Sequence, residues 1–136
     1  MIAGIGIDVV DIARFERTLE RTPGLVERLF AESERGRPAR SLAARFAAKE
    51  SLIKALGGRI GINWHDMRVV QDELGNPDFA LTGPVAAHLA EIGVDRVHLS
   101  MSHDAGIASA FVVLESTGAD PGRAPAAGAE PGDPDR

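Results

Sequence analysis

The sequence predicts a small domain of the α+β class, and three features of its pattern indicate this. Residues 38–56 are rich in strong helix formers with apolar side chains at helical spacing, which predicts one long helix. Residues 4–9 alternate apolar side chains with small or acidic residues, which is typical of a strand. Two later pairs of apolar runs, each joined by turn residues, predict two β-hairpins.

The first predicted strand has two different faces. Ile5, Ile7 and Val9 lie on one face, and two glycines and Asp8 lie on the other, which we expect to be open. Glycine in a strand often marks the close approach of a ligand or of another backbone. Asp8 is therefore either a functional carboxylate at the end of a bare surface or simply the residue that ends the strand.

Shorter elements are expected on both sides of the long helix. Asp11 is a suitable N-cap for a helix that follows the first strand, and Thr22 and Pro23 suit the start of a short second helix. Pro38 suits the first turn of the long helix, and glycine suits its end. After it, the pattern predicts a hairpin (66–70 and 79–81), a helix (84–92) and a second hairpin (97–103 and 107–114).

The long helix carries Glu50 and Lys54 one turn apart, on a strip whose other members are small. A Glu–Lys pair at this spacing is most often a solvated ion pair, worth about 0.2–0.5 kcal/mol. Here the strip borders the apolar face of the helix. The two residues could instead hold a metal ion and a phosphate, because Mg²⁺ binds one or two carboxylates together with phosphate oxygens.

Composition limits the classes of protein to which this chain can belong. A chain of 136 residues without cysteine predicts one domain that lacks disulfides and thiolate metal sites, and we expect a cytoplasmic protein. The N-terminus lacks the basic region of a secretory signal, and no segment reaches the roughly 18 apolar residues of a membrane span. A net charge of −5, few aromatic residues and no nucleic-acid-binding signature argue against nucleic acid as a partner.

The charge is unevenly distributed along the chain. Residues 14–59 carry eleven basic and six acidic side chains, and Arg14, Arg17 and Arg21 form a stripe on the first predicted helix, here called the arginine stripe. Such a stripe is either a solvated face or a surface for an acidic protein or a polyphosphate ligand. Residues 116–136 are rich in Pro, Gly and Ala without periodic apolar residues, so we predict a folded domain at 1–115 and a disordered tail at 116–136.

Three spaced motifs together resemble the holo-[acyl-carrier-protein] synthases, the short form of the 4′-phosphopantetheinyl transferases. The motifs are Gly4-Ile5-Gly6-Ile7-Asp8, Arg45-Phe46-Ala47-Ala48-Lys49-Glu50 continuing to Lys54, and Ser100-Met101-Ser102-His103. The resemblance extends from Met1 to about Glu115. It implies an α+β fold with a long helix packed on an antiparallel sheet, and a homotrimer with active sites at the subunit interfaces.

The resemblance also implies an activity. Enzymes of this family use Mg²⁺ to transfer the 4′-phosphopantetheine arm of coenzyme A to a serine of an apo acyl carrier protein, in fatty-acid or polyketide synthesis, and release adenosine 3′,5′-bisphosphate. By motif match, Asp8 and Glu50 would be the metal ligands, and Lys54 would lie against the same phosphates as the third catalytic residue. Whether Glu50, a metal-bound water or another group accepts the proton of the serine stays open.

Further positions match the family's binding residues. Arg45, Lys49 and His103 match residues that face the 3′-phosphate and adenine end of coenzyme A, and the arginine stripe matches the helix that docks the acidic carrier protein. Two alternatives to the transferase remain. One is a Mg²⁺-dependent phosphohydrolase that uses the same three catalytic residues with water as acceptor, and the other is a non-catalytic module that binds coenzyme A or the carrier protein.

Overall fold

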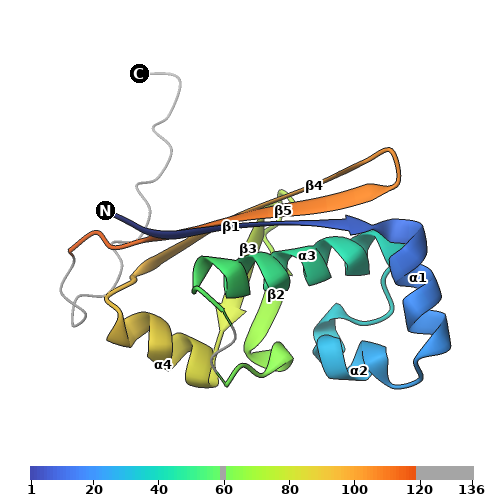
Figure 1. The fold of residues 1–136 in the computed structure, drawn as a ribbon, viewed down its shortest axis with the longest axis horizontal. Coiled ribbons are helices and arrows are strands. Elements are labelled where there is room, and N and C mark those ends of the chain that lie inside the picture. Colours follow the sequence, from blue (N-terminus) through green and yellow to red (C-terminus); the bar gives the residue numbers. More distant parts are fainter. Residues whose placement is uncertain (59–60, 119–136) are drawn as a thin grey trace.

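A computed structural model describes residues 1–58 and 61–118 of the chain, which form a three-stranded sheet with one long helix across it (Figure 1). The strands are antiparallel and lie in the order β1-β5-β4, with β1 at Ile2–Asp11, β4 at Arg96–Asp104 and β5 at Ile107–Glu115. The long helix is α3, Ala39–Ala55. The predicted α+β class and the packing of a long helix on an antiparallel sheet are confirmed.

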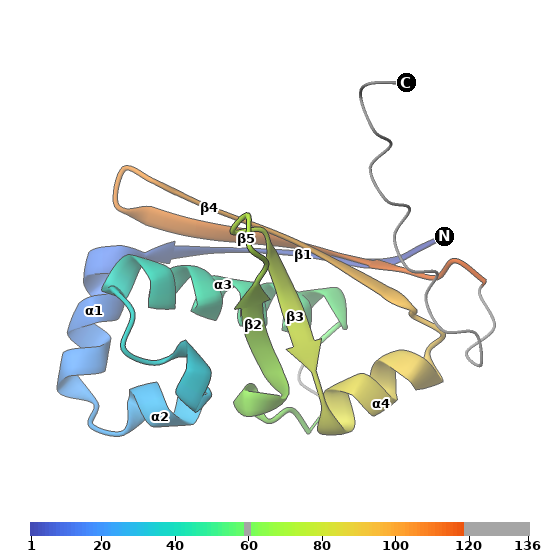
Figure 2. The same ribbon diagram turned by 180° about the vertical axis from the view of Figure 1, so that it is seen from behind.

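The remaining helices lie on the side of α3 that faces away from the sheet, and a two-stranded hairpin runs alongside α3 and reaches β4 (Figures 1 and 2). They are α1 (Ile12–Arg21), α2 (Leu25–Leu29), β2 (Met67–Gln71), β3 (Pro77–Leu81) and α4 (Gly83–Glu91), with 3-10 helices at Glu32–Glu34 and Trp64–Asp66. Their order agrees with the prediction, and Asp11 caps α1 by accepting a hydrogen bond from the backbone N–H of Arg14 at 2.9 Å. The short helix α2 begins at Leu25 with Gly24 as its N-cap, rather than at Pro23 with Thr22 as its N-cap, because Gly24 has a left-handed backbone (φ 81°).

The glycine face of β1 packs directly against the backbone of α3. A Cβ atom added to Gly6 would lie 1.9 Å from the backbone oxygen of Ser51, and one added to Gly4 would lie 2.2 Å from that of Ala55. No side chain fits in so small a space. The expectation that this face is open was therefore wrong: the close approach predicted by the glycines is made by the long helix itself.

The open face of the sheet is instead the apolar one. Ile5, Ile7 and Val9 are 62%, 57% and 58% exposed, and Phe111, which is paired with Ile7 across the β1–β5 ladder, is 44% exposed. No described element of the chain covers these four side chains, here called the outer apolar face. An exposed apolar patch of this kind is typical of a protein–protein interface.

Two buried apolar clusters lie along α3. One surrounds the N-terminal half of the helix and includes Phe15, Leu29 and Phe30. The other surrounds its C-terminal half and includes Leu52 and Leu89. Among the described helices, none is both long and apolar enough to cross a membrane.

The described contacts extend beyond the predicted domain end at Glu115. The backbone N–H of Ser116 donates to the carbonyl oxygen of Met1 at 2.8 Å. The backbone N–H of Thr117 donates to Asp95 Oδ1 at 2.8 Å, and the Thr117 hydroxyl donates to Asp95 Oδ2. These bonds from Thr117, led by that of its hydroxyl, hold the pKa of Asp95 below its usual value. Most of the predicted tail, residues 119–136, lies outside the described residues.

These contacts predict different effects for two truncations. A chain ending at Gly118 should keep the melting temperature of the full chain, whereas a chain ending at Glu115 should melt a few degrees lower at pH 7. Because the folded pKa of Asp95 is lowered, its stabilisation is present above the unfolded pKa of about 3.9 and is lost as the pH falls through the folded pKa. Thermal unfolding should therefore show a smaller difference near pH 3, and equal melting temperatures at pH 7 would contradict this account.

Candidate active site

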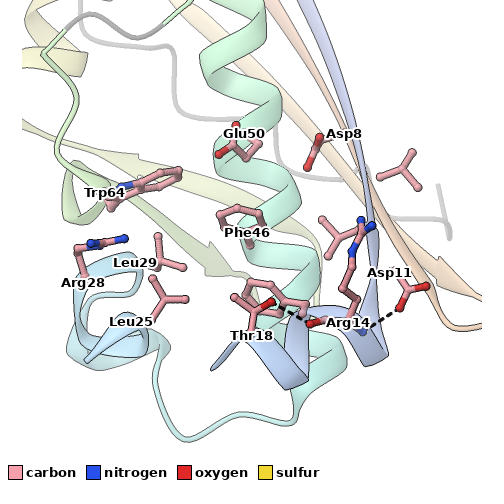
Figure 3. Close-up of a pocket in the computed structure, with 13 residues that line it drawn as sticks. Asp8, Asp11, Arg14, Thr18, Leu25, Arg28, Leu29, Phe46, Glu50 and Trp64 are labelled. Atoms are coloured by element: carbon pink, nitrogen blue, oxygen red, sulfur yellow. Dashed lines mark hydrogen bonds between the residues drawn. The ribbon is translucent and has the colours of Figure 1, made fainter. Parts of the chain in front are cut away.

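A cavity of about 440 Å³ lies beside α3, between the end of β1 and the helices α1 and α2 (Figure 3). Its walls combine charged and polar side chains with apolar and aromatic ones. The ring of Phe46 stacks on that of Phe15 at a centroid distance of 5.1 Å and on that of Trp64 at 5.8 Å. We call it the carboxylate cavity, because two of the residues that line it are Asp8 and Glu50.

Asp8 and Glu50 approach the carboxylate cavity from different elements. Asp8 follows Gly4 and Gly6 on the face of β1 that packs against α3, and Glu50 is a half-buried residue of α3. Figure 3 shows both side chains at one end of the cavity, with Leu25 and Leu29 toward the other end. The contact between β1 and α3 thus brings together two carboxylates that are far apart in the sequence.

Lys54 joins the same group of residues. Its ammonium donates to Asp8 Oδ1 at 3.0 Å and to the backbone oxygen of Ile7 at 2.9 Å. The lysine side chain is 54% exposed, so this ion pair adds only about 0–1 kcal/mol to stability. An exposed ammonium next to two carboxylates is instead well placed to meet an anionic ligand.

Asp8 and Glu50 offer carboxylate oxygens to the metal ion that the sequence implies. Within residues 1–58 and 61–118, no three His, Asp or Glu side chains are grouped as a metal cage. Asp8 and Glu50 therefore offer two carboxylates and no more. This fits Mg²⁺, which usually binds one or two carboxylates and completes its coordination with water and substrate phosphate.

A second cavity, of about 400 Å³, lies on another side of α3. It is lined by Arg45 of α3 and by His103 of β4, and we call it the arginine cavity. Arg45 is only 2% exposed; its Nη1 donates to Ser41 Oγ at 2.5 Å, whereas Nε and Nη2 have no partner among the described residues. Burial, and then the nearby Arg37, lower the pKa of Arg45. A buried guanidinium with two free donors is suited to an anion.

The two cavities do not merge within one chain. Asp8 and His103 lie on β1 and β4, which are the opposite edges of the sheet. Glu50 and Arg45 are five residues apart on α3, so they are separated by about 140° around the helix axis. The single chain therefore holds the predicted site residues as two separate groups.

Lys49 is the position where the structure differs from the expectation of a coenzyme A contact. The ammonium is fully buried and uses all three of its donors inside the protein, on Glu34 Oε1 (2.7 Å) and on the backbone oxygens of Leu29 (2.7 Å) and Trp64 (3.3 Å). Desolvation lowers the pKa of Lys49, and Glu34 opposes that shift. In this arrangement Lys49 lies behind the wall of the carboxylate cavity and is not available to a ligand.

The arginine stripe lies on the solvent side of α1. Arg14, Arg17 and Arg21 are all exposed, and Arg14 also lines the carboxylate cavity. In the part of the chain that the structure describes, none of the three forms an ion pair with Glu16 or Glu20. The stripe is therefore not neutralised by its neighbours on the helix.

Comparison with known proteins decides the family. Residues 4–110 match the model of the 4′-phosphopantetheinyl transferase superfamily. The chain belongs to this superfamily. It is 70% identical over 115 residues to a holo-[acyl-carrier-protein] synthase of Clavibacter michiganensis subsp. michiganensis, an alignment that covers 85% of this chain and 97% of that protein. It is 64% identical to the corresponding enzyme of Leifsonia xyli subsp. xyli over 85% of this chain and 98% of the relative.

Solved structures agree with this assignment to the phosphopantetheinyl transferases. The structure matches the holo-[acyl-carrier-protein] synthase of Neisseria meningitidis with a TM-score of 0.76 and 36% identity, covering 85% of this chain and 100% of that chain. It matches the Helicobacter pylori enzyme in complex with coenzyme A with a TM-score of 0.72 and 32% identity, covering 82% and 99% of the two chains. The predicted family is confirmed, and neither the phosphohydrolase nor the binding-module alternative is supported.

Several residues around the transferase site were not identified from the sequence. Trp64, Leu29 and Arg28 line the carboxylate cavity, and Glu34 lies behind it. Glu34 and Trp64 belong to short connecting segments, where neither helical nor strand periodicity marks a residue as buried. Trp64 is the one tryptophan of the chain, and its size was the only signal that could have indicated a cavity wall.

The free donors of Arg45 predict a trade-off between stability and anion binding. Arg45→Met should raise the melting temperature in the absence of ligand, because it removes unsatisfied buried donors that cost about 1–3 kcal/mol. The same change should reduce the rise in melting temperature that added inorganic phosphate produces. A lower melting temperature together with an unchanged response to phosphate would mean that Arg45 is only a packing residue.

Proposed function

We propose that this chain transfers the 4′-phosphopantetheine arm of coenzyme A to a serine of an apo acyl carrier protein, in the cytoplasm, and releases adenosine 3′,5′-bisphosphate. The observation that carries the proposal is the grouping of Asp8 and Glu50 at one end of a cavity, with the Lys54 ammonium 3.0 Å from Asp8. Arg14 of the arginine stripe also lines this cavity, so a reactive site and a basic surface are adjacent. Family membership supports the same reaction.

Asp8 and Glu50 are the residues that would hold Mg²⁺. When bound, the ion supplies charge neutralisation for the pyrophosphate. Lys54 would move its exposed ammonium from Asp8 to a phosphate oxygen, which is a short displacement for a flexible side chain. The aromatic wall of Phe46 and Trp64 limits the access of water, which would otherwise compete with the serine as acceptor.

The reaction is a single displacement at phosphorus. The serine oxygen of the carrier protein forms a bond to the phosphorus that bears the pantetheine arm, and the bond from that phosphorus to the bridging pyrophosphate oxygen breaks. The electron pair of the broken bond stays on adenosine 3′,5′-bisphosphate, and the serine hydroxyl gives up its proton. Glu50 is one candidate to accept that proton, because it is a carboxylate that lines the cavity.

The arginine cavity would bind the 3′-phosphate and adenine end of coenzyme A through Arg45 and His103. Because this cavity and the carboxylate cavity are separate in one chain, we propose that a complete site forms between two protomers of a homotrimer. The outer apolar face supports this assembly, since Ile5, Ile7 and Val9 are more than half exposed on the strand that carries Asp8. Head-to-tail contacts that close into a ring would give every protomer the same pair of neighbours.

Mixing inactive variants tests the shared site. Glu50→Gln and His103→Ala should each abolish transfer alone, but hybrids of the two should regain activity, because some sites then combine intact halves from different protomers. Random mixing in equal amounts should restore about a quarter of the wild-type rate. The rate is measured as the gain in mass of an apo carrier protein.

The matched control is a mixture of Asp8→Asn with Glu50→Gln, which alter the same half of the site and should restore nothing. Subunit exchange is verified by native mass spectrometry. If exchange occurs and neither mixture recovers, the site is completed within one chain and the shared-site proposal fails. Retained activity in Glu50→Gln alone at saturating Mg²⁺ would refute its role as a metal ligand.

The arginine stripe should act on the encounter with the carrier protein. Arg14→Glu should raise the Michaelis constant for the acidic carrier protein by roughly fivefold to tenfold while leaving that for coenzyme A nearly unchanged. Wild-type transfer should also slow with added salt, because surface charges are screened beyond about 8 Å at physiological ionic strength. The control is Arg96→Glu, an equal charge change at the far end of the sheet from α1. An equal effect of both changes would show that only net charge matters.

A further inference from the structure

A buried ion pair lies directly behind the carboxylate cavity and has no part in the reaction proposed above. Lys49 and Glu34 have side chains that are 0% and 1% exposed, and Lys49 Nζ lies 2.7 Å from Glu34 Oε1. The ammonium also lies 5.0 Å from the ring centroid of Phe30. The cost of desolvation cancels most of the stability that a buried ion pair could add. The pair is therefore significant mainly for the positions in which it holds the neighbouring elements.

The pair connects five separate parts of the chain. Lys49 belongs to α3 and donates to the backbone oxygens of Leu29, the last residue of α2, and of Trp64, the first residue of a 3-10 helix. Glu34, in the 3-10 helix Glu32–Glu34, accepts hydrogen bonds from the backbone N–H of Ala31 at 3.0 Å and from that of Val69 in β2 at 3.1 Å. The buried Arg45 guanidinium is also near the pair, since burial and then the positive charge of Arg45 lower the pKa of Lys49.

Two of these anchored residues form the cavity wall. The side chains of Leu29 and Trp64 line the carboxylate cavity, and their backbone oxygens are held from behind by the same ammonium. Lys49 also directly precedes Glu50 on α3. One side chain thus fixes the distance between α2, the Trp64 segment and the helix that carries a catalytic carboxylate.

We propose that the Lys49–Glu34 pair is a positioning element that sets the width of the carboxylate cavity, and so limits which groups on the sulfur end of the arm the enzyme accepts. This inference rests on the proposed function. With the nucleotide in the arginine cavity and the pyrophosphate near Asp8, Glu50 and Lys54, the arm of coenzyme A extends along the apolar walls. An acyl group on the thiol lengthens the arm and must fit between the same walls.

Loss of the Lys49–Glu34 pair should loosen the wall of the carboxylate cavity. Lys49→Met alone would leave the carboxylate of Glu34 buried and unpaired, which threatens the fold. In the double variant Lys49→Met/Glu34→Gln that charge is absent, while the backbone oxygens of Leu29 and Trp64 lose their common donor. The preference of wild type for free coenzyme A over hexanoyl-coenzyme A, taken as the ratio of the two kcat/KM values, should fall roughly fivefold in this variant.

Three controls separate positioning from general loosening. Leu89→Ala disturbs the apolar cluster along the C-terminal half of α3. Even if it lowers the melting temperature as much as the double variant does, it should leave the preference for free coenzyme A unchanged. Glu34→Gln alone keeps the bonds of Lys49 to the backbone oxygens of Leu29 and Trp64 but leaves the ammonium buried without a counter-charge, so it should lower the melting temperature and leave the preference for free coenzyme A unchanged. The fluorescence of Trp64, the one tryptophan, should shift to longer wavelength in the double variant but not in Leu89→Ala.

The outcomes are distinct. An unchanged preference in a folded, active double variant would overturn the inference, as would an equal shift in Leu89→Ala. If the double variant does not fold, Lys49→Arg takes its place. The planar guanidinium of arginine keeps a positive charge beside Glu34 but cannot reproduce the three tetrahedral N–H donors of the lysine ammonium. An unchanged preference in Lys49→Arg would overturn the inference equally. Absence of transfer by wild type would instead refute the proposed function.

Discussion

The contact between the glycines of β1 and the backbone of α3 is the constraint on which the rest of the structure depends. It lets the strand approach the helix so closely that a Cβ at Gly6 would lie 1.9 Å from a backbone oxygen. Asp8 continues the same face of the strand and is therefore delivered to the helix that carries Glu50 and Lys54. Because both sides of the contact are backbone, no change of side chain on α3 could make room for a larger residue at Gly6.

Features that depend on local sequence were predicted well. The limits of the long helix follow from Pro38, the run of helix formers and Gly57, and both hairpins follow from turn residues between apolar runs. The link between Asp8, Glu50 and Lys54 came from three motifs taken together, since a Glu–Lys pair at this spacing is by itself most often a solvated ion pair. In the structure, the Lys54 ammonium donates to Asp8, across 46 residues of sequence.

Features that depend on distant partners were not predicted. The glycine face was expected to be open because periodicity tells which residues share a face, but not which element covers it. Lys49 was assigned to coenzyme A by motif match, and its buried partner Glu34, 15 residues earlier in a polar connecting segment, has no signal in the sequence. The division of the site residues between two cavities depends in turn on the order of strands in the sheet, which is a property of the whole fold.

The position of β1 in the sheet has a consequence for the newly made chain. In the described structure β1 is an edge strand, pairing only with β5, and its outward side chains are Ile5, Ile7 and Val9. It is long, lacks proline and carries little charge, which are the properties of segments that pair with strands of foreign chains. A chain whose β1 edge and outer apolar face stay uncovered is therefore prone to aggregate.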